Sequence, residues 1–250
     1  MSLKLIVKDA DFYADAISYT PAVADGLEYL NFFGGSQASL GRNLAPGKPA
    51  ASVVGSPVVN TSNAVFSYLE RLVKTGVMQT NDATVIMVAK FPAGATNIWR
   101  QVVSNFGRDN GTGGLKYGLS LSFKVDAADV RSALGLVPVA TGSASSITSN
   151  RPAVAGSTIF ASARVDSVAR SLTIDNKTTG TTLTTLYAAT LKPELNGEFY
   201  IGSAAGLRAD STGDVEVSFA AIYSRTLSDA ENSAVYQSVR AIYASRGVTI

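Results

Sequence analysis

The stretch GDVEVSFAAIYSRTLSDAENSAVYQSVRAIYASRGV, residues Gly213–Val248, carries the strongest structural signal in the chain. Its first part alternates in polarity, as a strand with one buried face does. The apolar set on that face is Val215, Val217, Phe219 and Ala221. Beyond Ser228 the apolar residues recur at helical spacing instead. We therefore expect a β-strand that ends near Tyr223 and leads directly into a helix.

The ends of this helix are marked by capping residues. Ser228 and Glu231 form the capping box S-x-x-E, in which each side chain satisfies a backbone N–H that has no partner within the helix. Asp229 adds negative charge at the positive end of the helix dipole. Arg246 and Gly247 are typical of a last turn and a C-terminal cap.

The helix predicted over residues 228–246 needs a surface on which to pack. Its apolar stripe consists of Ala234, Val235, Val239, Ile242 and Tyr243. About 18 residues of helix are only marginally stable in water without tertiary contacts. We expect the stripe to cover a β-sheet, because the rest of the chain is typical of β-structure.

Short apolar runs separated by turns predict the remaining strands. ATVIMVAKF, residues 83–91, has the continuous apolar character of a central strand, and STIFASARV, residues 157–165, alternates in polarity. In the latter run Ile159, Ala161, Ala163 and Val165 share one face, and LTIDN, residues 172–176, follows as a hairpin partner. Because no helices separate these strands, we predict an all-β chain of two antiparallel sheets.

Composition excludes several classes of function. The chain has 250 residues, which is long enough for one large sandwich with its own core. It lacks cysteine and histidine, so disulfides and histidine-dependent catalytic triads are excluded. The 21 basic and 19 acidic residues are scattered along the chain, so we expect no nucleic-acid partner. No segment approaches the roughly 20 apolar residues that span a bilayer, so we expect no membrane span.

The first 57 residues are predicted to form an N-terminal arm with loops, and residues 58–250 the sandwich domain with its helix. The apolar run near the N-terminus is too short and too charged for a signal peptide, so we expect synthesis in the cytoplasm. Exposed apolar patches are a liability on a monomer. We therefore predict assembly contacts at Leu5, Val7, Tyr29, Phe32 and Phe33.

The segment from GEFYIGSAAG through GDVEVSFAAIYSRTLSDAENSAVY, residues Gly197–Tyr236, resembles the laminin-G-like, or concanavalin A-like, jelly-roll family of lectins and glucanases. The resemblance implies an antiparallel two-sheet jelly-roll sandwich that ends in an α-helix. IVKDADFYADAISY and NLAPGKPAASVVGSP resemble the leaders of bacteriophage and prophage virion proteins with this fold. This second resemblance implies that the protein is part of a virion.

Glucanases of this family carry E-x-D-x-x-E on one strand, which places two carboxylates beside a glycosidic bond. The nearest string here is DVEVSF, in which Asp214 and Glu216 share a strand face but the order is reversed and the third carboxylate is missing. We interpret these two residues as part of a solvated strand face, and we expect the protein not to be an enzyme.

Sugar binding needs an aromatic platform with polar groups around it. The densest such cluster is NIWRQVVSNFGRDNGTGGLKYG. Its candidate carbohydrate-binding residues are Trp99, Asn105, Arg108, Asp109, Asn110 and Tyr117. The competing interpretation is a core tryptophan followed by a hairpin turn at RDNGTGG. No cofactor is expected, although a calcium ion could use Asp109 and Asn110.

Two function classes follow. One is a non-enzymatic tail, fibre or baseplate module of a phage that binds host-surface carbohydrate. The alternative is a structural head-decoration, head-fibre or tail-assembly subunit that docks on other virion proteins without binding glycans. In either case we expect self-association, most simply as a homotrimer. A cellular lectin-like protein is a third interpretation.

Overall fold

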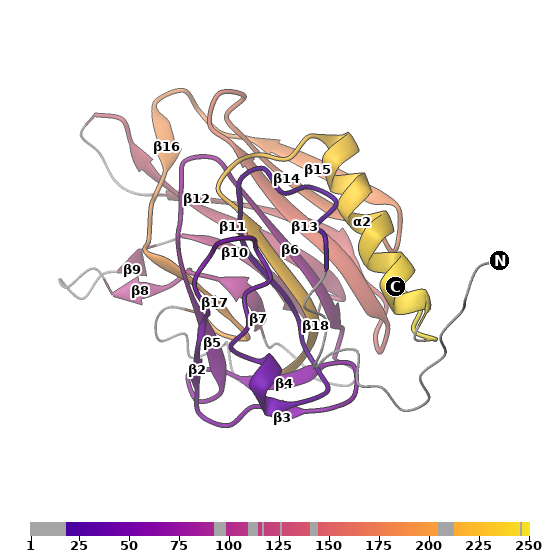
Figure 1. Cartoon of the computed structure of the whole chain (residues 1–250). Coiled ribbons are helices and arrows are strands. Elements are labelled where there is room, and N and C mark those ends of the chain that lie inside the picture. Colours follow the sequence, from indigo (N-terminus) through magenta and orange to yellow (C-terminus); the bar gives the residue numbers. More distant parts are fainter. Residues whose placement is uncertain are drawn as a thin grey trace.

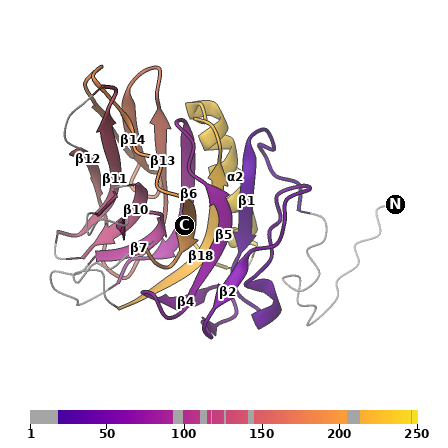
Figure 2. The same cartoon turned by 90° about the vertical axis from the view of Figure 1, so that its left-hand side faces the viewer.

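Two antiparallel sheets of eight strands each form the body of the protein in the computed structural model (Figure 1). The structure describes residues 19–92, 99–109, 115–116, 118–125, 127–140, 145–204, 213–245 and 247–250. Figure 2 shows helix α2 (Asp229–Ala244) beside strands β6 and β18, on the side that faces away from strands β10 and β11. The prediction of an all-β jelly-roll sandwich with a C-terminal helix is confirmed.

The first sheet, here called sheet A, has the strand order β15-β14-β13-β6-β18-β4-β3, and β1 also pairs with β18. Its strands are β1 (Leu27–Phe32), β3 (Val58–Val59), β4 (Ala64–Ser67), β6 (Ala83–Lys90), β13 (Thr158–Asp166), β14 (Ser171–Asn176), β15 (Thr181–Leu186) and β18 (Asp214–Tyr223). The predicted central strand β6 and the hairpin β13–β14 are confirmed.

The second sheet, sheet B, has the order β12-β11-β10-β7-β17-β5-β2, and β16 also pairs with β11. Its strands are β2 (Ser52–Val54), β5 (Leu72–Met78), β7 (Trp99–Ser104), β10 (Leu119–Lys124), β11 (Asp129–Pro138), β12 (Ser145–Pro152), β16 (Leu191–Pro193) and β17 (Glu198–Ile201). A separate two-stranded ladder joins β8 (Arg108–Asp109) to β9 (Leu115–Lys116), and a 3-10 helix η1 spans Gln37–Ser39.

The main core lies between the two sheets, and strand periodicity selects its residues. On β13 the residues Ile159, Ala161, Ala163 and Val165 all point into this core, as predicted. Strand β6 is buried on both faces, because Val85 faces sheet B while Ile86 packs beneath the helix. A continuous apolar sequence is the pattern expected for a strand with two covered faces.

The prediction of a single apolar face for β18 is wrong. Val215 and Val217 point between the sheets, but Phe219 and Ala221 lie on the opposite face, under the helix. A register shift between Val217 and Phe219 in the pairing with β6 explains the switch. An extra residue at such a β-bulge exchanges the faces of all residues beyond it.

Helix α2 (Asp229–Ala244) covers the outer face of sheet A through a second apolar cluster. Its buried residues include Val235, Val239 and Tyr243, and the Tyr243 hydroxyl donates to the backbone carbonyl of Ser218 at 2.7 Å. The predicted capping box is present in full. At the other end the N–H of Val248 donates to the carbonyl of Tyr243 at 2.9 Å, beside Gly247 with a φ of 73°.

The predicted arm boundary at residue 57 does not fit the described part of the chain. Strand β1 pairs with β18 and strand β2 pairs with β5, so both belong to the sheets. Tyr29 and Phe33 are fully buried in the core, and Phe32 packs beneath the helix. These three side chains therefore stabilise the fold and cannot form an exposed assembly patch. Leu5 and Val7 lie outside the described residues.

Helix α2 is too short and too polar to cross a bilayer, and the same holds for every other helix within the described ranges.

Candidate functional site

Trp99 lies at the start of β7 on the outer face of sheet B, where it is partly exposed. The strand register places Lys124 of β10 directly beside it and Asp129 of β11 beside Lys124. In the next row, Gln101 and Arg131 lie on either side of Ser122. Three neighbouring strands thus bring an aromatic ring, two cations and a carboxylate to one surface, which we call the Trp99 surface.

The charged side chains of this surface are in contact with the tryptophan and with one another. The Lys124 ammonium lies 5.7 Å and the Arg131 guanidinium 5.4 Å from the centre of the Trp99 ring, within cation–π range. Asp129 accepts from Arg131 at 3.2 Å and from Asn150 of β12 at 3.0 Å. These contacts fix the side chains in place while leaving Asn150 exposed and Arg131 about 25% exposed.

Asn105 does not belong to this surface, and the prediction that it binds carbohydrate is wrong. Its side chain is completely buried, and its amide donates to Gln79 at 2.8 Å and to the carbonyl of Gly197 at 3.1 Å. Its side-chain oxygen accepts from the N–H of Leu119 at 2.8 Å. A buried amide needs such partners, so Asn105 holds loops together, and its complete burial keeps its side chain from contact with a ligand.

The other residues predicted to bind carbohydrate belong to the region of the β8–β9 hairpin. Arg108 and Asp109 form β8, where Arg108 pairs with Lys116 and Asp109 with Leu115, but their side chains are not described. Asn110 and Tyr117 lie outside the described residues. The calcium prediction for Asp109 and Asn110 is therefore untested. Within the described part of the chain, no group of three or more carboxylate, histidine or cysteine side chains could hold a metal ion.

Sequence reasoning missed most of the Trp99 surface. Its other members lie on later strands, far from Trp99 in the sequence, and the register of strand pairing brings them beside it. They are Lys124, Asp129, Arg131 and Asn150. The alternation in LSLSFK, residues 119–124, indicates that Lys124 faces away from the core. The pairing that places it beside Trp99 leaves no local signal.

The carboxylates Asp214 and Glu216 lie at the start of β18, as a solvated strand face requires. Asp214 is about half exposed and forms an ion pair with Arg71 at 2.9 Å. Glu216 lies 3.6 Å from the ammonium of Lys90 and accepts from Asn63 at 3.4 Å. Both therefore lie in surface ion pairs.

Several solved structures share this architecture. A Trypanosoma rangeli sialidase in complex with sialic acid matches with a TM-score of 0.57 and 16% identity, over 86% of this chain and 33% of the sialidase. The binding domain of botulinum neurotoxin serotype D matches with a TM-score of 0.58 and 10% identity, over 90% of this chain and 52% of the toxin chain. The architecture that these chains share is a β-sandwich.

A further structure, a mutant of HCR/D, matches this sandwich with a TM-score of 0.59 and 9% identity, over 86% of this chain and 52% of that chain. The chain thus spans about a third to a half of the solved chains it matches. No protein-family model matches the chain, and no curated protein matches its sequence. At these identities the likeness shows the fold, and any function has to be argued from the chain's own residues.

Proposed function

We propose that the protein is a non-enzymatic bacteriophage virion module that binds host-surface carbohydrate through the Trp99 surface. The observation that carries this proposal is the partly exposed Trp99 on a lectin-like sandwich, surrounded by side chains that can donate and accept hydrogen bonds. It is the one tryptophan in the sequence. Aromatic rings with a few convergent polar groups are typical of small-ligand sites.

The chemistry of binding follows from the side chains in place. The apolar part of a sugar ring can pack against the exposed portion of Trp99, while Arg131 donates to ring or hydroxyl oxygens. Asp129 and the exposed Asn150 accept hydrogen bonds from sugar hydroxyls. Because Asp129 already orients Arg131, the site needs little reorganisation on binding.

The absence of catalysis is part of the proposal. In most glycosidase families, hydrolysis uses two carboxyl groups that flank one bond, one of them protonated. On β18 the two carboxylates instead lie in ion pairs with Arg71 and Lys90 at the surface. Binding without turnover is the activity that this arrangement supports.

The virion assignment rests on the leader resemblance at the N-terminus. We place the protein in a tail, fibre or baseplate, made in the host cytoplasm and incorporated into the particle as a homotrimer that contacts other virion proteins. Sedimentation of the purified protein tests the trimer. A monomeric mass of the purified protein would contradict it.

The alternative is a structural subunit that docks on other virion proteins. Such a subunit would use large apolar side chains on its surface, and the most exposed in the described part of the chain are Val168 at 87%, Leu186 at 71%, and Val139 and Val154 at 62% each. Exposed apolar groups are often covered by partner proteins when they form one patch.

Glycan-array binding by the purified protein distinguishes the two functions. We expect saturable binding that Trp99→Ala abolishes and that Trp99→Phe retains in part, since an aromatic ring remains. Val168→Ala, a change at a side chain that is 87% exposed, serves as the matched control and should leave binding unchanged. An absence of glycan binding, with retained binding to purified tails or capsids, would refute the lectin function and support the structural one.

A further inference from the structure

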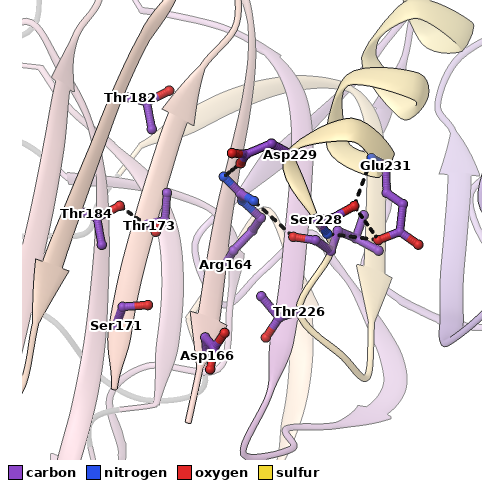
Figure 3. Close-up of a pocket in the computed structure, with 11 residues that line it drawn as sticks. Arg164, Asp166, Ser171, Thr173, Thr182, Thr184, Thr226, Ser228, Asp229 and Glu231 are labelled. Carbon is purple, nitrogen blue, oxygen red and sulfur yellow. Dashed lines mark hydrogen bonds and ion pairs between the residues drawn. The ribbon is translucent and has the colours of Figure 1, made fainter. Parts of the chain in front are cut away.

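A second candidate site is a cleft of about 580 Å³ on the outer face of sheet A, beside the first turn of α2 (Figure 3). Its walls come from β13, β14 and β15 on one side and from the segment that joins β18 to α2 on the other. Hydroxyl groups predominate, and they belong to Ser171, Thr173, Thr182, Thr184, Thr226 and Ser228. The volume lies within the roughly 300–1,000 Å³ of small-molecule sites.

Strand alternation produces the hydroxyl wall. On β14 the side chains of Leu172 and Ile174 enter the core, so Thr173 points outward into the cleft. Thr184 of β15 lies opposite Thr173, and their hydroxyl oxygens are 2.9 Å apart. Each hydroxyl can accept as well as donate, so this pair retains capacity for a ligand.

Arg164 is the one cation among the lining residues, and its charge is already compensated. Its guanidinium contacts the buried Asp175 at 2.9 Å and Asp229 at 2.6 Å, and it donates to the carbonyl of Leu227 at 2.9 Å. These contacts hold the side chain at the base of the cleft. A ligand anion would have to compete with two carboxylates for the same group.

The remaining charges of the lining are negative. The lining contains three carboxylates, from Asp166, Asp229 and Glu231, and one cation, Arg164, so its formal charge is −2. The carboxylate of Glu231 is paired with Arg225 at 2.7 Å, outside the lining. A bound anion would therefore approach a lining in which carboxylates outnumber cations, which is unfavourable.

We propose that this cleft binds a neutral polyhydroxylated ligand, such as a hexose unit of a glycan. Hydroxyls on two walls and the carboxylates at the helix corner can exchange hydrogen bonds with sugar hydroxyls, and no ionised ligand group is needed. The cleft goes beyond the Trp99 surface, because it lies on the other sheet and shares none of its residues. The lining contains no aromatic side chain, so binding is weak and rests on hydrogen bonds.

Saturation-transfer NMR of the full chain tests the site with the methyl glycosides of glucose, galactose and mannose, and with methyl glucuronide as the matched anion. We expect saturable binding of at least one neutral glycoside and none of the glucuronide. The double variant Thr173→Val/Thr184→Val removes both members of a hydroxyl pair and keeps their shape, a change that is nearly neutral for folding. Measured in the Trp99→Ala background, in which the Trp99 surface no longer contributes, it should weaken neutral binding by about tenfold or more.

Trp99→Ala separates this site from the proposed lectin function, since it should leave binding in the cleft unchanged. Failure of every neutral glycoside, equal binding of the glucuronide, or full binding by the double variant would overturn the proposal. Loss of the NMR signal in Trp99→Ala would assign the binding to the Trp99 surface and would also overturn it. Loss of glycan-array binding in Trp99→Ala, with the cleft signal retained, supports both sites.

Discussion

Replacement of Asp175 by alanine should destabilise the protein strongly, because Asp175 is the buried partner of Arg164. Its side chain is only 2% exposed, and Arg164 is 9% exposed. One carboxylate oxygen accepts from Arg164 at 3.1 and 2.9 Å and from the Asn232 amide at 3.1 Å. The other accepts from Thr182 at 2.6 Å. Asp175→Ala removes all these acceptors at once.

The expected cost follows from what Arg164 retains. Removal of one partner from a buried ion pair costs about 3–5 kcal/mol. Asp229 still faces the guanidinium, but its side chain is 86% exposed, and the Leu227 carbonyl remains. We therefore expect the lower end, about 3 kcal/mol of unfolding free energy. For a chain of this length that corresponds to a fall in Tm of roughly 6–12 °C.

Urea unfolding and thermal melts of matched variants measure the effect. Asp214→Ala is the control, because it breaks an ion pair with Arg71 on a side chain that is 54% exposed, and such pairs contribute only about 0–1 kcal/mol. The apolar double variant Arg164→Met/Asp175→Leu should be more stable than Asp175→Ala, because it leaves no buried charge. Equal unfolding free energies for Asp175→Ala and the control would refute the reasoning.

Two further predictions concern the helix corner and a close backbone contact. Hydrogen bonds from Arg225, and then from the Ser228 backbone and hydroxyl, lower the pKa of Glu231 from 4.5 to about 2. The ionised carboxylate therefore stabilises the fold above pH 4.5, and this effect is lost as the pH falls towards 2. The unfolding free energy of Glu231→Gln should consequently change less between pH 4.5 and pH 2 than that of the original protein. Equal changes in both proteins would contradict the lowered pKa of Glu231. Gly202→Ala should destabilise the sandwich severely, because its Cβ would lie 2.1 Å from the Cβ of Phe66 at a φ of 78°; an unchanged thermal melt would disprove that contact.

The fold was predictable where the signal is local. The capping box at Ser228 and Glu231 and the alternation of β13 depend on neighbouring residues, and both are confirmed. The face exchange at Phe219 was not predictable, because both faces of β18 are buried beyond the β-bulge and its residues there are apolar on either face, so no alternation marks the shift. The assembly contacts predicted at Tyr29, Phe32 and Phe33 are wrong because apolar residues of a buried core and of an exposed interface look the same in the sequence.

The candidate site was predictable only in its central residue. Trp99 is on the sheet surface, but Asn105 is in a buried network that sequence spacing does not reveal. Lys124 and Arg131 reach Trp99 through strand pairing, and Thr173 and Thr184 meet in the same way on the other sheet. Long-range register decides both sites.

Because Trp99 is the one tryptophan in the sequence, its fluorescence reports directly on the proposed carbohydrate site. Titration of the purified protein with the best glycan from the array should produce a saturable change in the intensity and wavelength of this emission. Asn150→Ala, which removes an exposed polar partner of Asp129, should weaken the apparent affinity. Carbohydrate binding without any change in the emission spectrum would show that the ligand binds elsewhere on the protein. That result would contradict the proposal that carbohydrate binds at the Trp99 surface.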